Sequence, residues 1–278
     1  MIAILLIAFG SCLTEVSDSI GKNEVGHGRQ SLFMMGFLQL VAGAFIFLLL
    51  ILVKPALFVF SWFSLPTFIA RAILEVILAH ITILAVTTAD RSTFSFIRLG
   101  TVPLLLVADI ILGFHLRPTQ LFGLLLLLVT LLLVFVNPAI SKKGVGWVGA
   151  STLMAAVTIA LYKYDISHFN SVLAEQFITY LIVLGYFFVR ACWHDSQHFF
   201  RLFSKPLYLL QAAAQGLGGV AESYAYSLAP ASVILAAKRS TAVMWAIGSG
   251  SLYFREKHIL VKLSVFILLV GGLILLAL

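Results

Sequence analysis

The chain has 278 residues, of which 62% are hydrophobic and 10% are charged. A soluble globular protein is about 45–50% apolar and 25% charged, and even a large soluble core needs a charged surface around it. The composition therefore excludes an ordinary soluble protein and indicates a membrane protein. A spanning helix needs about 20 apolar residues, so the chain has room for about ten spans.

The formal net charge of +7 comes from basic residues that lie singly in short turns. Nucleic-acid binding would need a clustered basic stripe, and scattered charges favour contact with anionic lipid headgroups instead. The two cysteines, Cys12 and Cys192, have neither metal-ligand nor redox spacing. We therefore expect a lipid bilayer and a small molecule as partners, no nucleic acid and no cofactor.

Apolar runs separated by turn residues predict the helices in chain order. Every backbone polar group in hydrocarbon must be bonded internally, so runs of this length are helices rather than strands. The breaks carry turn residues such as Lys54-Pro55 and Arg117-Pro118, and no loop is long enough to form a domain. The expected spans are 1–20, 31–53, 66–87, 92–113, 119–136, 144–163, 171–191, 206–228, 230–253 and 259–278.

The sequence pattern of the first half recurs in the second half. When the chain is shifted on itself so that Arg98 falls on Lys238, the breaks between apolar runs coincide, and we call this alignment the repeat register. Residues 1–138 and 139–278 then form two repeats of five spans each, and the odd number turns the second repeat upside down relative to the first. We expect an all-α polytopic membrane protein with a 5+5 inverted repeat, an architecture in which transporters bind substrate near the midplane.

Polar residues inside the expected spans mark candidate sites, because a charge at the bilayer centre costs at least about 2.5–3.5 kcal/mol. The third span carries Arg71 and Glu75 on one face, and the repeat register places a matching polar face on the eighth span. These faces either line a cavity or hold helices together through an Arg71–Glu75 pair and interhelical hydrogen bonds. The residues of the two faces are Arg71, Glu75, Thr82, Gln211, Gln215 and Glu222.

The first span also carries acidic residues. Glu15 lies well inside it and is a candidate for substrate contact, whereas Asp18 lies near the expected helix end. Tyr162 lies near the end of the sixth span in the same way. We interpret Asp18 and Tyr162 as exposed to water.

Three cations lie within spans: Lys238 and Arg239 in the ninth, and Arg98 in the fourth. Adjacent helical residues point about 100° apart, so one cation can face a cavity while its neighbour pairs with a carboxylate such as Glu222 or Glu75. Converging cations suit a phosphate or carboxylate group. Alternatively, the cations are neutralised by the nearby acids Glu15, Asp18, Glu75, Asp109 and Glu222.

Other motifs are weak. His194 and His198 have i, i+4 spacing without a third ligand, so we expect no metal site. His80 is interpreted as a buried histidine in preference to a proton relay. The sequence contains no phosphate-binding loop and no nucleophile motif, so we expect no catalytic residues and no enzyme.

The C-terminal stretch 229–278 begins with Ala229-Pro230-Ala231-Ser232, continues as a long helix to the turn Arg255-Glu256, and ends in a helix that contains glycine. It resembles the last two helices of the drug/metabolite transporter superfamily, EamA type, and a fainter copy lies at 89–136. The resemblance implies a ten-helix inverted repeat and transport, often export, of small metabolites.

The Lys238-Arg239 pair is also similar to one in the triose-phosphate and nucleotide-sugar transporter branch. There the pair contacts substrate phosphate, which by resemblance makes Lys238 and Arg239 substrate contacts and Arg98 their repeat counterpart. Family members keep both termini in the cytoplasm. With both termini in the cytoplasm, three Lys and Arg residues lie in cytoplasmic turns and eleven lie on the opposite side. Because cytoplasmic turns usually carry the excess of Lys and Arg, the charges favour both termini outside the cytoplasm.

We therefore expect a secondary transporter, by resemblance an exporter, of a small polar metabolite that is anionic or zwitterionic. Alternating access between the halves would move it across the inner membrane of a prokaryote, and the coupling ion, a proton or none, is left open. A membrane scaffold and a membrane-embedded enzyme are the alternatives, and the unit is a monomer or homodimer. The candidate substrate-binding residues are Arg98, Lys238, Arg239, Glu75, Glu222, Gln211, Gln215, Arg71 and Glu15.

Overall fold

The structure is a computed structural model that describes residues 2–105, 118–137, 141–194, 205–228 and 231–277. Within these ranges the chain is helical and contains no strand. The helices are α1 (Ile2–Gly26), α2 (Leu32–Val53), α3 (Leu65–Thr88), α4 (Arg91–Arg98), α6 (Pro118–Val136), α7 (Val145–His168), α8 (Val172–His194), α10 (Pro206–Leu228), α11 (Ala231–Leu252) and α12 (Ile259–Ala277), with short 3-10 turns η1 (Pro55–Leu57) and η2 (Trp62–Ser64).

Five segments in the described ranges are long and apolar enough to cross a membrane, which is compatible with an integral membrane protein. Large apolar side chains such as Phe63 and Leu252 lie almost fully exposed on the outside. Such exposed large apolar side chains lie on most of the described helices. The five segments are Ile2–Gly26, Leu32–Val53, Trp62–Thr88, Val145–His168 and Val172–His194.

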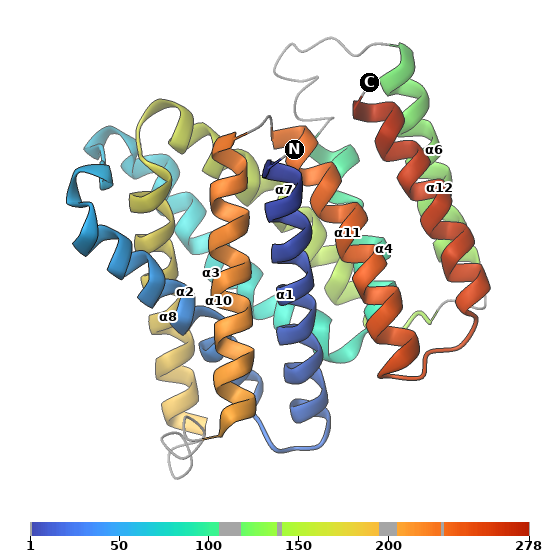
Figure 1. Cartoon of the computed structure of the whole chain (residues 1–278), viewed down its shortest axis with the longest axis horizontal. Coiled ribbons are helices and arrows are strands. Elements are labelled where there is room, and N and C mark those ends of the chain that lie inside the picture. Colours follow the sequence, from blue (N-terminus) through green and yellow to red (C-terminus); the bar gives the residue numbers. More distant parts are fainter. Residues whose placement is uncertain (1, 106–117, 138–140, 195–204, 229–230, 278) are drawn as a thin grey trace.

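The helix starts and the packing partners both follow the repeat register. Helix α2 begins at Leu32 and its counterpart α8 at Val172, and α4 begins at Arg91 and its counterpart α11 at Ala231. In space, α1 packs on α10 and α11, and the corresponding helix α7 packs on α3 and α4. Helix α2 packs on its own counterpart α8, and α6 packs on α12 at one edge of the bundle (Figure 1).

Contacts along the helices fix their relative directions. Gly36 near the start of α2 lies against Phe187 near the end of α8, and Gly43 further along α2 lies against Tyr180. The two counterpart helices therefore run antiparallel. Figure 1 places the first turn of α1 and the last turn of α12 at the same end of the bundle.

Small residues allow α1 and α10 to lie side by side. A Cβ atom on Gly218 would lie 2.8 Å from the carbonyl oxygen of Gly10, so a larger residue would push the backbones apart. Close approach through glycine is a common way to pack helices in membranes. This close packing places α10 against α1 and α2 of the first half, and α10 also lines the polar cavity described below.

Two helices extend beyond their expected ends, which corrects an interpretation made from the sequence. Helix α1 continues to Gly26 and α7 to His168. Asp18 and Tyr162 therefore lie more than one turn from the helix ends and are only 8% and 6% exposed, so the interpretation of both as water-exposed was wrong. Charged residues late in α1 had suggested an earlier end, but Lys22 donates a hydrogen bond to the carbonyl oxygen of Ala89.

Candidate functional site

A polar cavity lies among α3, α7, α8, α10 and α11. Its volume is about 220 Å³, which is room for about seven water molecules at ~30 Å³ each. A cavity of this size suits a small metabolite rather than a lipid or a large drug. Its walls consist of Arg71, Glu75, Thr158, Ile159, Tyr162, Gln176, Tyr180, Gln215, Gly219, Glu222, Ser223 and Lys238.

The polar faces expected on the third and eighth spans meet at this cavity. Arg71 and Glu75 lie one turn apart on α3, so both point the same way. Gln215 and Glu222 line the same cavity from α10. Gly219 on α10 leaves space for the ring of Tyr180, since a Cβ there would lie 2.5 Å from the Tyr180 hydroxyl.

Two of the cavity cations form ion pairs. The Lys238 ammonium contacts the Glu222 carboxylate, as the sequence had suggested for one of the two adjacent cations. Arg71 donates from Nη1 to Oε1 of Glu175 on α8 at 2.6 Å, and both side chains are buried. The Arg71–Glu75 pair considered from the i, i+4 spacing is therefore replaced by a longer-range pair that sequence reasoning missed.

Glu75 differs from the other charged residues of the cavity. Within the described part of the chain it forms no ion pair, and its Oε2 atom is buried without a hydrogen-bond partner. Oε1 of Gln215 and Nε of Arg71 are likewise buried without a hydrogen-bond partner. Of these three atoms at the cavity, two are acceptors and one is a donor.

The remaining expected site residues lie outside the cavity wall. Arg98 donates from Nη1 to the carbonyl oxygen of Ser151 at 2.9 Å. Arg239 donates from Nε to the hydroxyl of Thr101 at 3.0 Å. Of the three cations, only Lys238 lines the cavity, and oxygens of neighbouring helices bind the other two.

Gln211 and Glu15 also lie away from the cavity. Gln211 accepts a hydrogen bond from Nε2 of Gln30, in the turn between α1 and α2, at 3.2 Å. Asn170 occupies the position that matches Gln30 in the repeat register. It donates to Glu175 at 2.6 Å, so equivalent turns in both halves carry amides that fix polar groups of the bundle.

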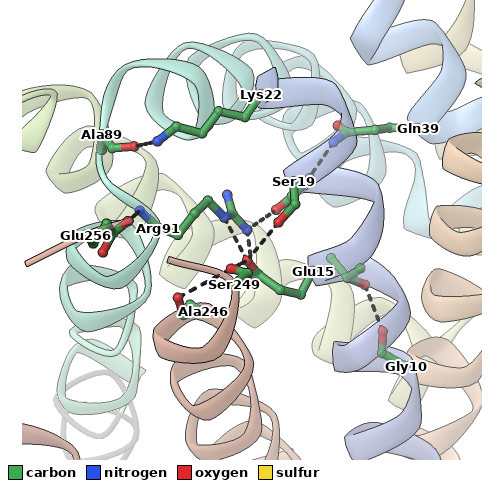
Figure 2. A network of polar contacts seen from close by, with 12 residues as sticks. Gly10, Glu15, Ser19, Lys22, Gln39, Ala89, Arg91, Ala246, Ser249 and Glu256 are labelled. Atoms are coloured by element: carbon green, nitrogen blue, oxygen red, sulfur yellow. Dashed lines mark hydrogen bonds and ion pairs between the residues drawn. The ribbon is translucent and has the colours of Figure 1, made fainter. Parts of the chain in front are cut away.

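Glu15 belongs to a second polar cluster, the Arg91 network (Figure 2), which is built around a residue that the sequence placed in a turn. Arg91 is 1% exposed. Its guanidinium donates to both carboxylate oxygens of Glu15 at 2.8 and 2.7 Å and to Asp18 at 3.0 Å. Ser249 on α11 donates to the same Glu15 carboxylate, and Gln39 on α2 donates to Asp18 at 2.8 Å.

The network continues to the turn before α12. Glu256 accepts hydrogen bonds from the backbone N–H of Arg91 at 2.7 Å and from the Ser92 hydroxyl at 2.5 Å, and it pairs with Lys262 at 2.7 Å. Burial raises the pKa of the Glu256 carboxyl, but the hydrogen bonds from Lys262 and Ser92 outweigh this and lower the pKa below its ordinary value. Helices α1, α4, α11 and α12 are thereby tied together through ionised groups.

The cavity and the Arg91 network lie at different depths of the bundle. Helix α11 contributes Lys238 to the cavity wall and Ser249 to the network. Eleven residues separate them, which at 1.5 Å per residue is about 16 Å along the helix axis. The cavity lies near the start of α11 and the network lies near its end.

Among the described residues, no group of three or more His, Cys, Asp or Glu side chains is placed to hold a metal ion. Asp109 and His198, considered above as a neutralising acid and a metal ligand, lie outside the described residues, as does the repeat boundary at residue 138. No protein-family model matches the chain, and no curated protein matches it either.

Proposed function

We propose that the chain is a secondary transporter that moves a small polar metabolite through the cavity by alternating access. The observation that carries the proposal is a polar cavity inside an apolar helix bundle, with the buried Arg91 network further along α11. Polar groups buried in a membrane are costly and usually mark a substrate pathway.

The ten-span inverted repeat is part of the proposal. The recurrence of helix starts in the repeat register supports it, as does the exchange of packing partners between the halves. The antiparallel course of α2 and its counterpart α8 supports a two-fold axis that lies across the helices. An axis in the membrane plane is the symmetry of inverted-repeat transporters.

The relation between the cavity and the Arg91 network supports alternating access. Thr158 and Tyr162 line the cavity, and the matching positions of the first repeat are Asp18 and Lys22. Asp18 pairs with Arg91, and Lys22 is bonded to Ala89. Positions that line the cavity in the second half thus correspond to positions engaged in polar contacts in the first half. Such an asymmetry is expected for a pathway that is closed on one side at a time.

The resemblance to EamA-type drug/metabolite transporters fits this function and suggests export from the inner membrane of a prokaryote. The cavity volume of about 220 Å³ favours a small substrate over a nucleotide sugar. The pairing of Arg71 and Lys238 with carboxylates disfavours a free phosphate. We therefore place the substrate among compact polar metabolites.

Flux measurements in liposomes test the proposal. Vesicles containing the purified protein are loaded with a pool of small polar metabolites, and efflux of each compound is followed by mass spectrometry. We expect selective efflux of a few compounds that protein-free vesicles retain. The variant Gly219→Leu, which fills the cavity, should abolish it, whereas Gly185→Leu, at an open helix position, should not. Equal efflux from all three proteins would contradict the proposal.

A further inference from the structure

We infer that the cavity recognises an ammonium group and that the carboxylate of Glu75 binds it. This inference rests on the proposed function and narrows its substrate to compact molecules that carry a protonated amine. Of the anionic and zwitterionic metabolites expected from the sequence, it favours those that carry an ammonium group, because the cations of the cavity are already paired.

The charge balance of the cavity wall is the first argument. Lys238 is paired with Glu222, and Arg71 is paired with Glu175 directly behind the wall. Of the four charged residues that line the described cavity, Glu75 is left as the one without an ion pair. The wall therefore presents one carboxylate that has no direct ion-pair partner among the described residues and that interacts with Arg98 only at longer range.

The unsatisfied hydrogen-bonding atoms are the second argument. Oε2 of Glu75 and Oε1 of Gln215 are both acceptors, and both are buried without a partner among the described residues. An ammonium group has three donors and no acceptor. It can donate to acceptors of this kind, whereas a carboxylate or phosphate brings only further acceptors.

The aromatic rings of the cavity suit the same ligand. Tyr162 and Tyr180 both line the wall, and the face of Tyr162 already lies 4.6 Å from the Arg71 guanidinium. Aromatic faces attract cations, most strongly where water is excluded. The free Nε donor of Arg71 then remains for an oxygen elsewhere in the substrate, such as a hydroxyl or a carboxylate.

Of the more distant cations, Arg98 interacts electrostatically with Glu75 and Glu222 but forms no ion pair with either. Arg98 and Arg239 bind neutral oxygens of Ser151 and Thr101 and do not line the cavity. An anionic ligand would compete with Glu222 for Lys238 and with Glu175 for the Nη1 donor of Arg71, and only the Nε donor of Arg71 is left for it without competition. Separating Arg71 from Glu175 leaves a buried carboxylate without its cation, which is costly.

Binding to the purified full chain in detergent tests the inference without requiring transport. The probes are ethanolamine and glycine, which carry an ammonium group, and acetate and ethylene glycol, which do not. Thermal shift and calorimetry should detect the first two alone. The variant Glu75→Gln keeps the size of the side chain and removes its charge, and it should weaken amine binding about 10- to 100-fold.

Two further variants serve as controls. Glu75→Asp keeps the charge and should retain part of the affinity, which separates loss of the carboxylate from misfolding. Glu24→Gln makes the same chemical change at a buried acid outside the cavity and should leave amine affinity unchanged. Tighter binding of glycine than of ethanolamine would assign Arg71 Nε to a carboxylate, and the reverse order would assign it to a hydroxyl.

The outcomes separate this inference from the proposed function. Amine binding that depends on Glu75 in a protein without flux would support the inference and refute transport. Flux together with equal binding of acetate, or with full amine affinity in Glu75→Gln, would refute the inference and leave transport standing. Absence of amine binding in the wild-type protein would also refute the inference.

Discussion

Arg91 and Glu15 form a buried bidentate ion pair, with Nε of Arg91 2.8 Å from Oε1 of Glu15 and Nη2 2.7 Å from Oε2. The pair joins the start of α4 to the middle of α1. Breaking a buried pair from one side costs more than the intact pair contributes, because the remaining charge has no partner. The stability of the bundle where α1, α4 and α11 meet should therefore depend strongly on Arg91.

Replacement of Arg91 by Gln tests this dependence. We expect the free energy of unfolding to fall by about 3–5 kcal/mol, because Glu15 and Asp18 are left buried without their cation. Unfolding of the detergent-solubilised protein by SDS, followed by circular dichroism, measures the change. The control Arg29→Gln alters a side chain that is 52% exposed, and its effect should stay below about 1 kcal/mol. Unchanged stability of Arg91→Gln would refute the pairing.

The Lys238–Glu222 pair makes a different prediction, since it lies at the cavity wall. Lys238→Gln should lower the melting temperature, and Glu222→Gln added to it should restore part of the loss. The coupling energy between the two changes should be about 0.5–3 kcal/mol, the range for residues in contact. Thermal melts of both single variants and the double variant give this energy. Strict additivity would mean that the two side chains act independently.

Close packing of α1 on α10 can be tested at Gly218. Gly218→Val places new atoms against the carbonyl oxygen of Gly10, so we expect a destabilisation of about 1–3 kcal/mol from overpacking. The matched control is Gly185→Val, because a Cβ at Gly185 meets no other atom within 4 Å. Equal unfolding transitions for the two variants would contradict the close approach.

The pH dependence of stability follows from Glu256. Its folded-state pKa lies below its ordinary value of 4.5, so the ionised carboxyl stabilises the folded state above pH 4.5. This contribution is lost as the pH falls through the folded-state pKa. The stability difference between wild type and Glu256→Gln should therefore be largest near neutral pH and shrink below pH 4.5. A difference that grows on acidification would contradict the hydrogen bonds to Lys262 and Ser92.

Much of the helix layout could be predicted from the sequence, because apolar runs and turn residues are local signals. The expected spans agree with the described helices to within a few residues at α2, α3 and α10. Helix α1 was expected to end at residue 20 because polar residues follow, and it continues to Gly26. Hydropathy does not show that Lys22 finds a backbone partner on another helix.

The cavity was predicted in part. The repeat register and the polar faces indicated that Glu75, Gln215 and Glu222 share one site, and all three line the cavity. Long-range partners were missed because a single sequence carries no information on which distant residues meet. Arg91 lies 76 positions from Glu15, and Arg71 lies 104 positions from Glu175. Gln30 and Asn170 occupy matching positions of the two repeats. This match could have indicated that the two turns carry side chains bonded to the polar interior.

The most direct test of the account is the accessibility of the cavity from the two sides of the membrane. Gln215, on the cavity wall, is replaced by Cys in a protein whose Cys12 and Cys192 are Ser, and a membrane-impermeant thiol reagent is applied to oriented vesicles. We predict labelling only from the side of the chain termini while the Arg91 network is intact. We predict labelling from both sides after Glu15→Gln and Arg91→Gln together. Labelling from neither side, or from both sides with the network intact, would contradict alternating access through this cavity.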